Sequence, residues 1–83
     1  MSKKILRFTA SYCQPCKMLA MNLEGADLGV PIEVVDIEVH QDVAEQYLIR
    51  SVPTLVLLED DKEVSRSVGL KTEEQIRDWV TVS

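Results

Sequence analysis

Cys13 and Cys16 are the only cysteines of the 83-residue chain, and Gln14 and Pro15 separate them. A pair at this spacing can contribute to a metal site, form a structural disulfide or act as a reactive dithiol. Structural zinc takes about four ligands, and beyond these thiols the chain has only His40, so no metal site is expected. A disulfide that closes so small a loop would stabilise the fold little. The spacing therefore favours a reactive dithiol.

The two cysteines stand at the expected junction of a strand and a helix. Residues 4–9 predict a strand, and the apolar residues after Cys16 follow a helical pattern up to Gly25. In the first turn of a helix the N–H groups are unpaired and the dipole is positive, so a thiolate at Cys13 would be stabilised there. Positions i and i+3 share a helix face, which places Cys16 within reach of the Cys13 sulfur. Pro15 lacks an N–H and suits this first turn.

A second strand and a second helix are expected to follow. Residues 32–37 form a β-branched run that predicts the strand. A capping pair of Asp42 and Glu45 is expected to begin the helix, which is short. Its apolar stripe is assigned to Val43, Tyr47 and Leu48.

A hairpin and a last helix complete the order βαβαββα. Residues 54–58 predict a buried strand, the acidic residues 59–61 a turn, and residues 63–68 alternate as a half-buried partner strand should. Thr72 and Gln75 predict a capping box for the final helix. The inner face of that helix is assigned to Ile76, Trp79 and Val80.

Length and charge limit the classes of protein to consider. A chain of 83 residues can form one domain, residues 1–83. Its 9 Lys and Arg against 14 Asp and Glu give a net charge of −5, which repels phosphate backbones and anionic lipid. No nucleic-acid or membrane partner is therefore expected. No apolar run approaches the roughly 18–20 residues that span a bilayer, so we expect a cytoplasmic protein, and a monomer.

The residues around the cysteines carry a family resemblance. Residues 12–17, Tyr-Cys-Gln-Pro-Cys-Lys, resemble the Trp-Cys-Gly-Pro-Cys-Lys loop of the thioredoxin family. Residues 47–54, which end in Val-Pro-Thr, are similar to the family's segment around its cis-proline. Val68-Gly69 falls where the family has a glycine beside the substrate groove. The resemblance covers nearly the whole chain, which begins at the strand before the cysteines and so is expected to lack the family's opening βα unit.

The resemblance implies a fold and an activity. The fold is α/β and thioredoxin-like: a four-stranded mixed sheet, with the first two strands parallel, the last two antiparallel and helices on both faces. The activity is protein disulfide reduction, in which Cys13 attacks and Cys16 resolves the mixed disulfide. No cofactor is implied, because the sulfurs carry both electrons. The implied partners are disulfide-containing proteins as substrates and a flavoprotein thioredoxin reductase or glutathione as reductant. The small size of the chain suggests ribonucleotide reductase as one target.

The resemblance also assigns substrate contacts. The Val52–Pro53 bond is expected to be cis, and the Val52 backbone to pair with an extended substrate segment. An ordinary proline at the first residue of a strand is the alternative for Pro53, and a simple strand end for Gly69. Tyr12 replaces the family's tryptophan and keeps an amphipathic ring for docking. The expected substrate-binding residues are Tyr12, Gln14, Pro15, Val52, Pro53 and Gly69.

Arg7 departs from the family pattern. The family's buried aspartate, on the strand beneath the second cysteine, falls at Arg7, which cannot accept a proton. A guanidinium near the sulfurs would favour thiolate and make the couple more oxidising, so Arg7 and Lys17 are assigned to redox tuning. The alternatives are an arginine that reaches solvent along its apolar stem and a lysine of the surface.

Two other functions stay open. A glutathione-dependent glutaredoxin fits the chain length, but glutaredoxins more often place proline directly after the first cysteine. The Gly-Gly and acidic pair that grip glutathione are also missing from residues 68–72. The other function is a non-enzymatic subunit that uses the fold to bind a partner, and the intact cysteine pair argues against it.

Overall fold

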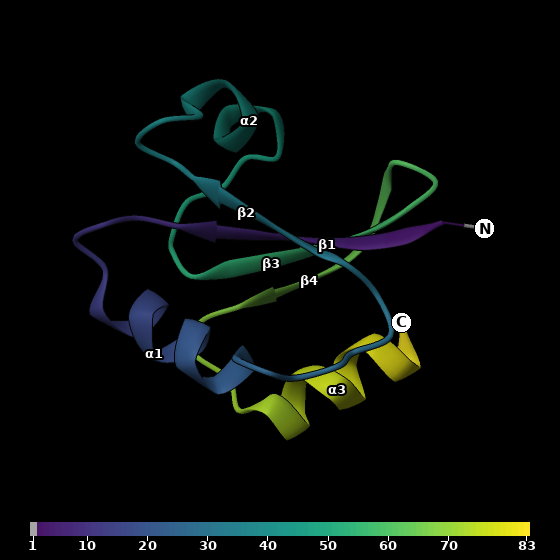
Figure 1. Cartoon of the computed structure of the whole chain (residues 1–83). Coiled ribbons are helices and arrows are strands. Elements are labelled where there is room, and N and C mark those ends of the chain that lie inside the picture. Colours follow the sequence, from purple (N-terminus) through teal and green to yellow (C-terminus); the bar gives the residue numbers. More distant parts are fainter. Residues whose placement is uncertain (1) are drawn as a thin grey trace.

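A four-stranded sheet carries three helices in the computed structural model, which describes residues 2–83 (Figure 1). The element order βαβαββα confirms the prediction, although β1 begins one residue earlier than expected and β2 ends one residue earlier. Within the sheet the strands lie in the order β2-β1-β3-β4. The elements are β1 (Lys3–Thr9), α1 (Gln14–Leu23), β2 (Ile32–Asp36), α2 (Gln41–Gln46), β3 (Thr54–Glu59), β4 (Lys62–Val68) and α3 (Glu73–Val82).

The sheet is mixed, as predicted. β1 runs parallel to β2 and antiparallel to β3, and β3 and β4 form a hairpin. The hairpin turn consists of Asp60 and Asp61, whose φ angles of 51° and 69° lie in the left-handed region that two-residue hairpin turns use. Glu59, predicted in the turn, instead ends β3. The Asp60 N–H donates to the Ser2 carbonyl at 2.7 Å, so the turn lies beside the start of β1 and far from Thr9.

Helices cover both faces of the sheet. α1 and α3 lie on one face, and α2 lies on the other (Figure 1). Because side chains alternate along a strand, Ile5 packs toward α1 and α3, while Leu6 and Phe8 pack toward α2. The buried residues are Ile5, Leu19, Leu23, Leu55, Leu57, Ile76 and Val80 on the first face, and Leu6, Phe8, Val35, Val56 and Leu58 on the second.

Helix α2 begins earlier than the sequence predicts. Its first residue is Gln41, and its N-cap is His40, whose side chain makes no capping hydrogen bond. The His40 carbonyl already accepts the Ala44 N–H at 3.2 Å. The predicted capping pair of Asp42 and Glu45 is therefore wrong, because Asp42 lies inside the first turn rather than before it.

The apolar stripe of α2 is shorter than predicted. Leu48 does not belong to it, because its φ of 53° turns the chain and leaves the side chain 71% exposed. Val43 and Tyr47 pack against the core as expected. The Tyr47 ring lies 5.9 Å from the Phe8 ring, centre to centre, which joins α2 to β1.

Strand β4 alternates as predicted but turns its valines outward. Val64 and Val68 are about half exposed, whereas Ser65 is half-buried. A β-bulge between Leu57 and Leu58 shifts the register of the hairpin and leaves Val64 without a partner across the sheet. The predicted alternation is therefore present over residues 64–68, with the serines rather than the valines on the more buried side.

The last helix has the predicted cap and inner face. The Gln75 N–H donates to Thr72 Oγ1 at 3.1 Å, and the Thr72 N–H donates to Gln75 Oε1 at 2.9 Å, which forms the capping box. Ile76 and Val80 are buried, and Trp79 packs beside them.

Candidate active site

Cys13 is the N-cap of α1, and Cys16 lies in the first turn of the same helix. The two residues form a disulfide, with their Cα atoms 5.2 Å apart. The Cys16 N–H donates to Cys13 Sγ at 3.1 Å, so an N–H of the first turn points at this sulfur. Pro15 occupies the same turn, where its missing N–H costs no helical bond. This geometry stabilises negative charge on Cys13 when the pair is reduced.

The two sulfurs differ in their access to solvent. Cys13 is 6% exposed and Cys16 is 1% exposed. Together with Ala10 they form a small buried cluster, against which Ile37 and Val52 pack. Both residues are therefore buried, and Cys13 is the slightly more exposed of the two.

The segment before β3 lies against the Cys13 sulfur. The Val52–Pro53 peptide bond is cis, as predicted, and Pro53 is buried. The Val52 carbonyl oxygen lies 3.6 Å from Cys13 Sγ. In the disulfide form this is a contact without a proton, but a Cys13 thiol can donate a hydrogen bond to the same oxygen. The Val52 carbonyl therefore gains or loses a partner as the pair changes its redox state.

Gly69 is tied to the cis-proline segment. Its N–H donates to the Pro53 carbonyl at 2.9 Å, and its φ of 94° lies in the region that favours glycine. The preceding residue, Val68, pairs with Thr54 at the start of β3. The hairpin thus brings the predicted glycine beside the cis-proline, and the residue before that proline, Val52, contacts the Cys13 sulfur.

Three side chains next to the cysteines in the chain are exposed. Tyr12 is 71% exposed, and its ring is open to contact with a partner. Gln14 and Lys17 are exposed on the first turns of α1. The two buried cysteines are therefore flanked in the chain by accessible side chains.

Arg7 lies on the face of the sheet that α1 and α3 cover. It alternates with Ile5 along β1 and pairs with Leu55, and both of those residues belong to the core of that face. Its side chain is half-buried, and this burial lowers the pKa of the guanidinium. Within residues 2–83 its guanidinium forms no salt bridge with a carboxylate. A partly desolvated cation therefore lies on the face that carries the cysteine helix.

Ser11 and Glu38 form a contact that sequence reasoning missed. Oε1 of Glu38 accepts the N–H of Ser11 at 3.1 Å and its O–H at 2.6 Å. Thr9 and Asp36 pair at the ends of the parallel strands β1 and β2, which brings the two following loops together. No local pattern indicates this contact, because the two residues are 27 positions apart. The contact anchors the turn that leads into Cys13.

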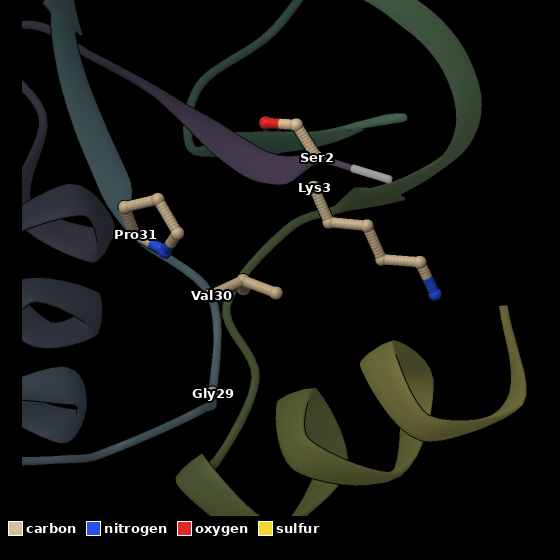
Figure 2. Close-up of a pocket in the computed structure, with 5 residues that line it drawn as sticks. All are labelled: Ser2, Lys3, Gly29, Val30 and Pro31. Carbon is tan, nitrogen blue, oxygen red and sulfur yellow. The ribbon is translucent and has the colours of Figure 1, made fainter. Parts of the chain in front are cut away.

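The far end of the sheet carries an open cavity of about 540 Å³ (Figure 2). Its walls come from the start of β1 and the segment before β2, whereas the cysteines follow the end of β1. Its lining residues are Ser2, Lys3, Gly29, Val30 and Pro31.

Neither a metal cluster nor a membrane span is found among residues 2–83. In that range no three His, Cys, Asp or Glu side chains are grouped so that they could hold a metal ion. None of its helices is both long and apolar enough to cross a bilayer.

Known proteins match this chain over most of its length. The profile of the Thioredoxin family matches residues 1–82. The thioredoxin of Chlamydia trachomatis is 45% identical over 75 residues, which cover 87% of this chain and 74% of that protein. The thioredoxin of Bacillus subtilis is 40% identical over 77 residues, with 88% and 74% covered. The structure of a mutant thioredoxin from Halobacterium salinarum has a TM-score of 0.90 at 31% identity and covers 98% of this chain and 74% of its own.

The four-stranded mixed sheet and the cysteine pair at the start of α1 define a thiol–disulfide oxidoreductase of thioredoxin-like fold. The close pair of Cys13 and Cys16 supports dithiol–disulfide exchange. By its family match and its relatives, the chain belongs to the thioredoxin family, which confirms the resemblance.

Proposed function

We propose that this chain is a protein disulfide reductase in which Cys13 is the attacking thiolate and Cys16 the resolving thiol. The N-cap position of Cys13 is the observation that carries the proposal, because its sulfur receives the Cys16 N–H at 3.1 Å. This environment raises the fraction of thiolate, the species that attacks disulfides. The 1% exposure of Cys16 keeps that thiol from competing for disulfides in solution.

The reaction consists of two exchanges. The Cys13 thiolate attacks one sulfur of the substrate disulfide, which forms a mixed disulfide and releases the other substrate sulfur as a thiolate. The Cys16 thiol loses its proton to solvent or to that leaving thiolate, and then attacks the Cys13 sulfur. The Cys13–Cys16 disulfide closes, and the second substrate thiolate leaves. Two electrons have passed from the dithiol to the substrate, so the disulfide form is the oxidised product.

The substrate docks as an extended segment against Val52. The Val52 carbonyl lies 3.6 Å from Cys13 Sγ, so a strand that pairs with this backbone has its cysteine beside the attacking sulfur. Pro53 holds this segment, and Gly69 borders it without a side chain that would block the approach. The exposed neighbours of the cysteines complete the contact surface: Tyr12, Gln14 and Pro15.

The proposed electron donor is a flavoprotein thioredoxin reductase, and glutathione is the alternative. The similarity to bacterial thioredoxins favours the flavoprotein. Ribonucleotide reductase is one proposed target. A reductase needs a reducing compartment, so we infer a cytoplasmic protein that takes part in electron transport and redox homeostasis. We also propose that residues 1–83 form one thioredoxin-like domain and that the chain acts as a monomer.

Insulin reduction with dithiothreitol tests the activity and the roles of the two thiols. Cys13→Ser should lower the rate to that of dithiothreitol alone. Cys16→Ser should still complete the first exchange and accumulate mixed disulfides that mass spectrometry detects. Iodoacetamide should alkylate Cys13 first at neutral pH, and preferential alkylation of Cys16 would reverse the assigned roles. A wild-type rate no higher than that of dithiothreitol alone would favour a binding subunit.

A coupled assay tests the proposed electron donor. Reduction of insulin is followed with NADPH and a bacterial thioredoxin reductase, and separately with NADPH, glutathione reductase and glutathione. We expect turnover in the first system and little in the second. The reverse result would identify a glutaredoxin-like protein.

Substitution of Tyr12 tests the docking surface. Tyr12→Ala should raise KM for insulin several-fold, because a large exposed ring contributes contact area beside the sulfurs. Met21→Ala is the matched control, since Met21 is 70% exposed on α1 but lies more than one turn beyond Cys16. An equal change in KM for both variants would remove Tyr12 from the docking surface.

A further inference from the structure

Lys71 lies at the end of a chain of contacts that starts at the Cys13 sulfur. Val52 contacts that sulfur at 3.6 Å through its carbonyl, and its neighbour Pro53 accepts the Gly69 N–H at 2.9 Å. A Cβ atom at Gly69 would lie 3.8 Å from Nζ of Lys71. The ammonium group therefore lies beside the glycine that borders the proposed substrate segment.

Hydrogen bonds hold Lys71 in this place. Its Nζ donates to the Val68 carbonyl at 2.7 Å. Its own carbonyl accepts the side-chain N–H of Asn22 at 2.9 Å, which anchors the lysine backbone to α1. An ammonium group has three donors, so two remain for an incoming acceptor. Because the side chain is half-buried and already oriented, a new contact would need little further ordering.

Lys71 forms no salt bridge within residues 2–83, as is also true of Arg7 and Lys62, but a hydrogen bond holds its side chain beside the proposed substrate segment. Three salt bridges pair Lys4, Arg66 and Arg77 with glutamates, and within residues 2–83 none of them involves Lys71. The protein has 14 acidic residues and a net charge of −5. A fixed lysine without a carboxylate partner, on an acidic protein and beside the proposed groove, provides a local site for negative charge.

We propose that Lys71 is a specificity-determining residue that binds an aspartate or glutamate side chain of the substrate near the disulfide to be reduced. The proposal rests on the reductase function and on docking at Val52. An extended segment advances about 3.3 Å per residue, so the acidic residue should lie roughly two to four positions from the substrate cysteine. The contact selects among substrates and takes no part in the exchange of electrons.

A peptide series tests this specificity. Each probe is a peptide with one cysteine in a mixed disulfide with a chromogenic thiol, and a single Asp is moved from the second to the fourth position on either side of the cysteine. Matched peptides carry Asn or Lys at the same positions. We expect the wild type to show kcat/KM about 2–5-fold higher for Asp than for Asn at one position, the size of a partly exposed ion pair. Added salt should reduce this ratio.

Three variants identify the residue responsible. In Lys71→Ala the ratio of Asp to Asn should fall to about one, in Lys71→Arg it should persist, and in Lys71→Glu the Lys peptide should become the preferred one. Lys62→Ala is the matched control, because Lys62 begins β4 at the far end of the strand from Val68 and forms no salt bridge within residues 2–83. Thermal unfolding checks that each variant is folded. If Lys71 only stabilised the turn after β4, Lys71→Glu would not change which peptide is preferred. An inverted preference between the Asp and Lys peptides therefore indicates direct contact with the substrate.

The outcomes separate this proposal from the reductase function. A wild type that reduces insulin but shows no Asp preference at any position would overturn the role of Lys71 alone. An Asp preference that survives in Lys71→Ala and does not invert in Lys71→Glu would do the same. A wild type that reduces neither insulin nor any peptide would overturn both proposals.

Discussion

The two faces of the sheet are covered unequally. On one face the helices α1 and α3, of ten residues each, contribute Leu19, Leu23, Ile76 and Val80 to the buried core. On the other face every buried core residue comes from a strand, and α2, of six residues, has none. Polar contacts connect α2 to the sheet instead. Arg66 of β4 donates a hydrogen bond to the Tyr47 carbonyl at 2.8 Å and forms a salt bridge with Glu63.

Because of this difference, we expect the cysteine helix α1 and the Val52 segment to differ in mobility. Cys16 belongs to α1 and so is held by the densely packed face. Val52 packs against the core beneath α2, as do Val43 and Tyr47. Elements with few buried apolar contacts open at a lower free energy than the core. We therefore expect the resolving thiol to stay fixed while the segment that pairs with substrate has more freedom.

The largest loss of stability should come from a substitution in the core of the α1/α3 face. Ile76→Ala removes a fully buried side chain and should lower the free energy of unfolding by about 2–5 kcal/mol. Val43→Ala, on the half-buried stripe of α2, should cost roughly 1 kcal/mol or less. Urea unfolding followed by Trp79 fluorescence gives both values. Equal losses of unfolding free energy in the two variants would contradict the inferred difference in packing between the two faces.

Arg66→Gln should have the next largest effect and lower the free energy of unfolding by about 1 kcal/mol. The substitution removes the hydrogen bond to the Tyr47 carbonyl at the end of α2 and the ion pair with Glu63. The hydrogen bond from Arg66 lowers the pKa of the Glu63 carboxyl. A carboxyl with a lowered folded-state pKa stabilises the fold above its unfolded value of about 4.3, and this contribution is lost as pH falls through the folded value.

The pH dependence separates the ion pair from the bond to Tyr47. The wild type should have a higher free energy of unfolding than Arg66→Gln. The share of this difference that comes from the ion pair with Glu63 should be fully present at neutral pH and should decrease below about pH 4. Urea unfolding at a series of pH values measures it. An advantage that grows on acidification would contradict the assigned pair.

Arg7 offers a test of electrostatics on the α1/α3 face. Arg7→Ala should lower the reduction potential and the fraction of Cys13 thiolate at neutral pH, and Arg7→Asp should move both further in the same direction. A change of about 30 mV corresponds to 1.4 kcal/mol for a two-electron couple, so half that energy is measurable. Equilibration with glutathione and thiolate absorbance across pH provide the two readouts. Unchanged values in both variants would mean that the guanidinium points away from the sulfurs.

The smallest effect should come from Ser11 and Glu38, which join the loops that follow β1 and β2. Glu38→Ala removes both hydrogen bonds and should reduce kcat/KM for insulin about twofold, while Ser11→Ala, which keeps the backbone bond, should reduce it less. Glu45→Ala on α2 is the control, because its exposed carboxylate makes no hydrogen bond within residues 2–83. A larger loss from Ser11→Ala than from Glu38→Ala would contradict the assigned contact.

The sequence predicted what local rules and a family motif determine. The order of elements, the capping box of α3 and the cis bond at Pro53 were all expected. Two of the features that it missed depend on distant pairing, whereas the start of α2 at Gln41 and the left-handed turn at Leu48 are local features that the capping rule and the apolar pattern placed wrongly. The β-bulge between Leu57 and Leu58 and the contact between Ser11 and Glu38 arise only after strands have met, so no nearby residue indicates them.

The turn at Asp60 and Asp61 offers a site for engineering. β3 separates this turn from the cis-proline segment, a distance of roughly 20 Å at about 3.3 Å per residue. Both residues of the turn are exposed, and such loop tips accept insertions well. A fluorophore, an affinity peptide or a surface linker placed there would lie at the opposite end of β3 from the cis-proline segment. The hairpin could thus carry a redox probe, or tether the protein to a bead as a reusable reductant.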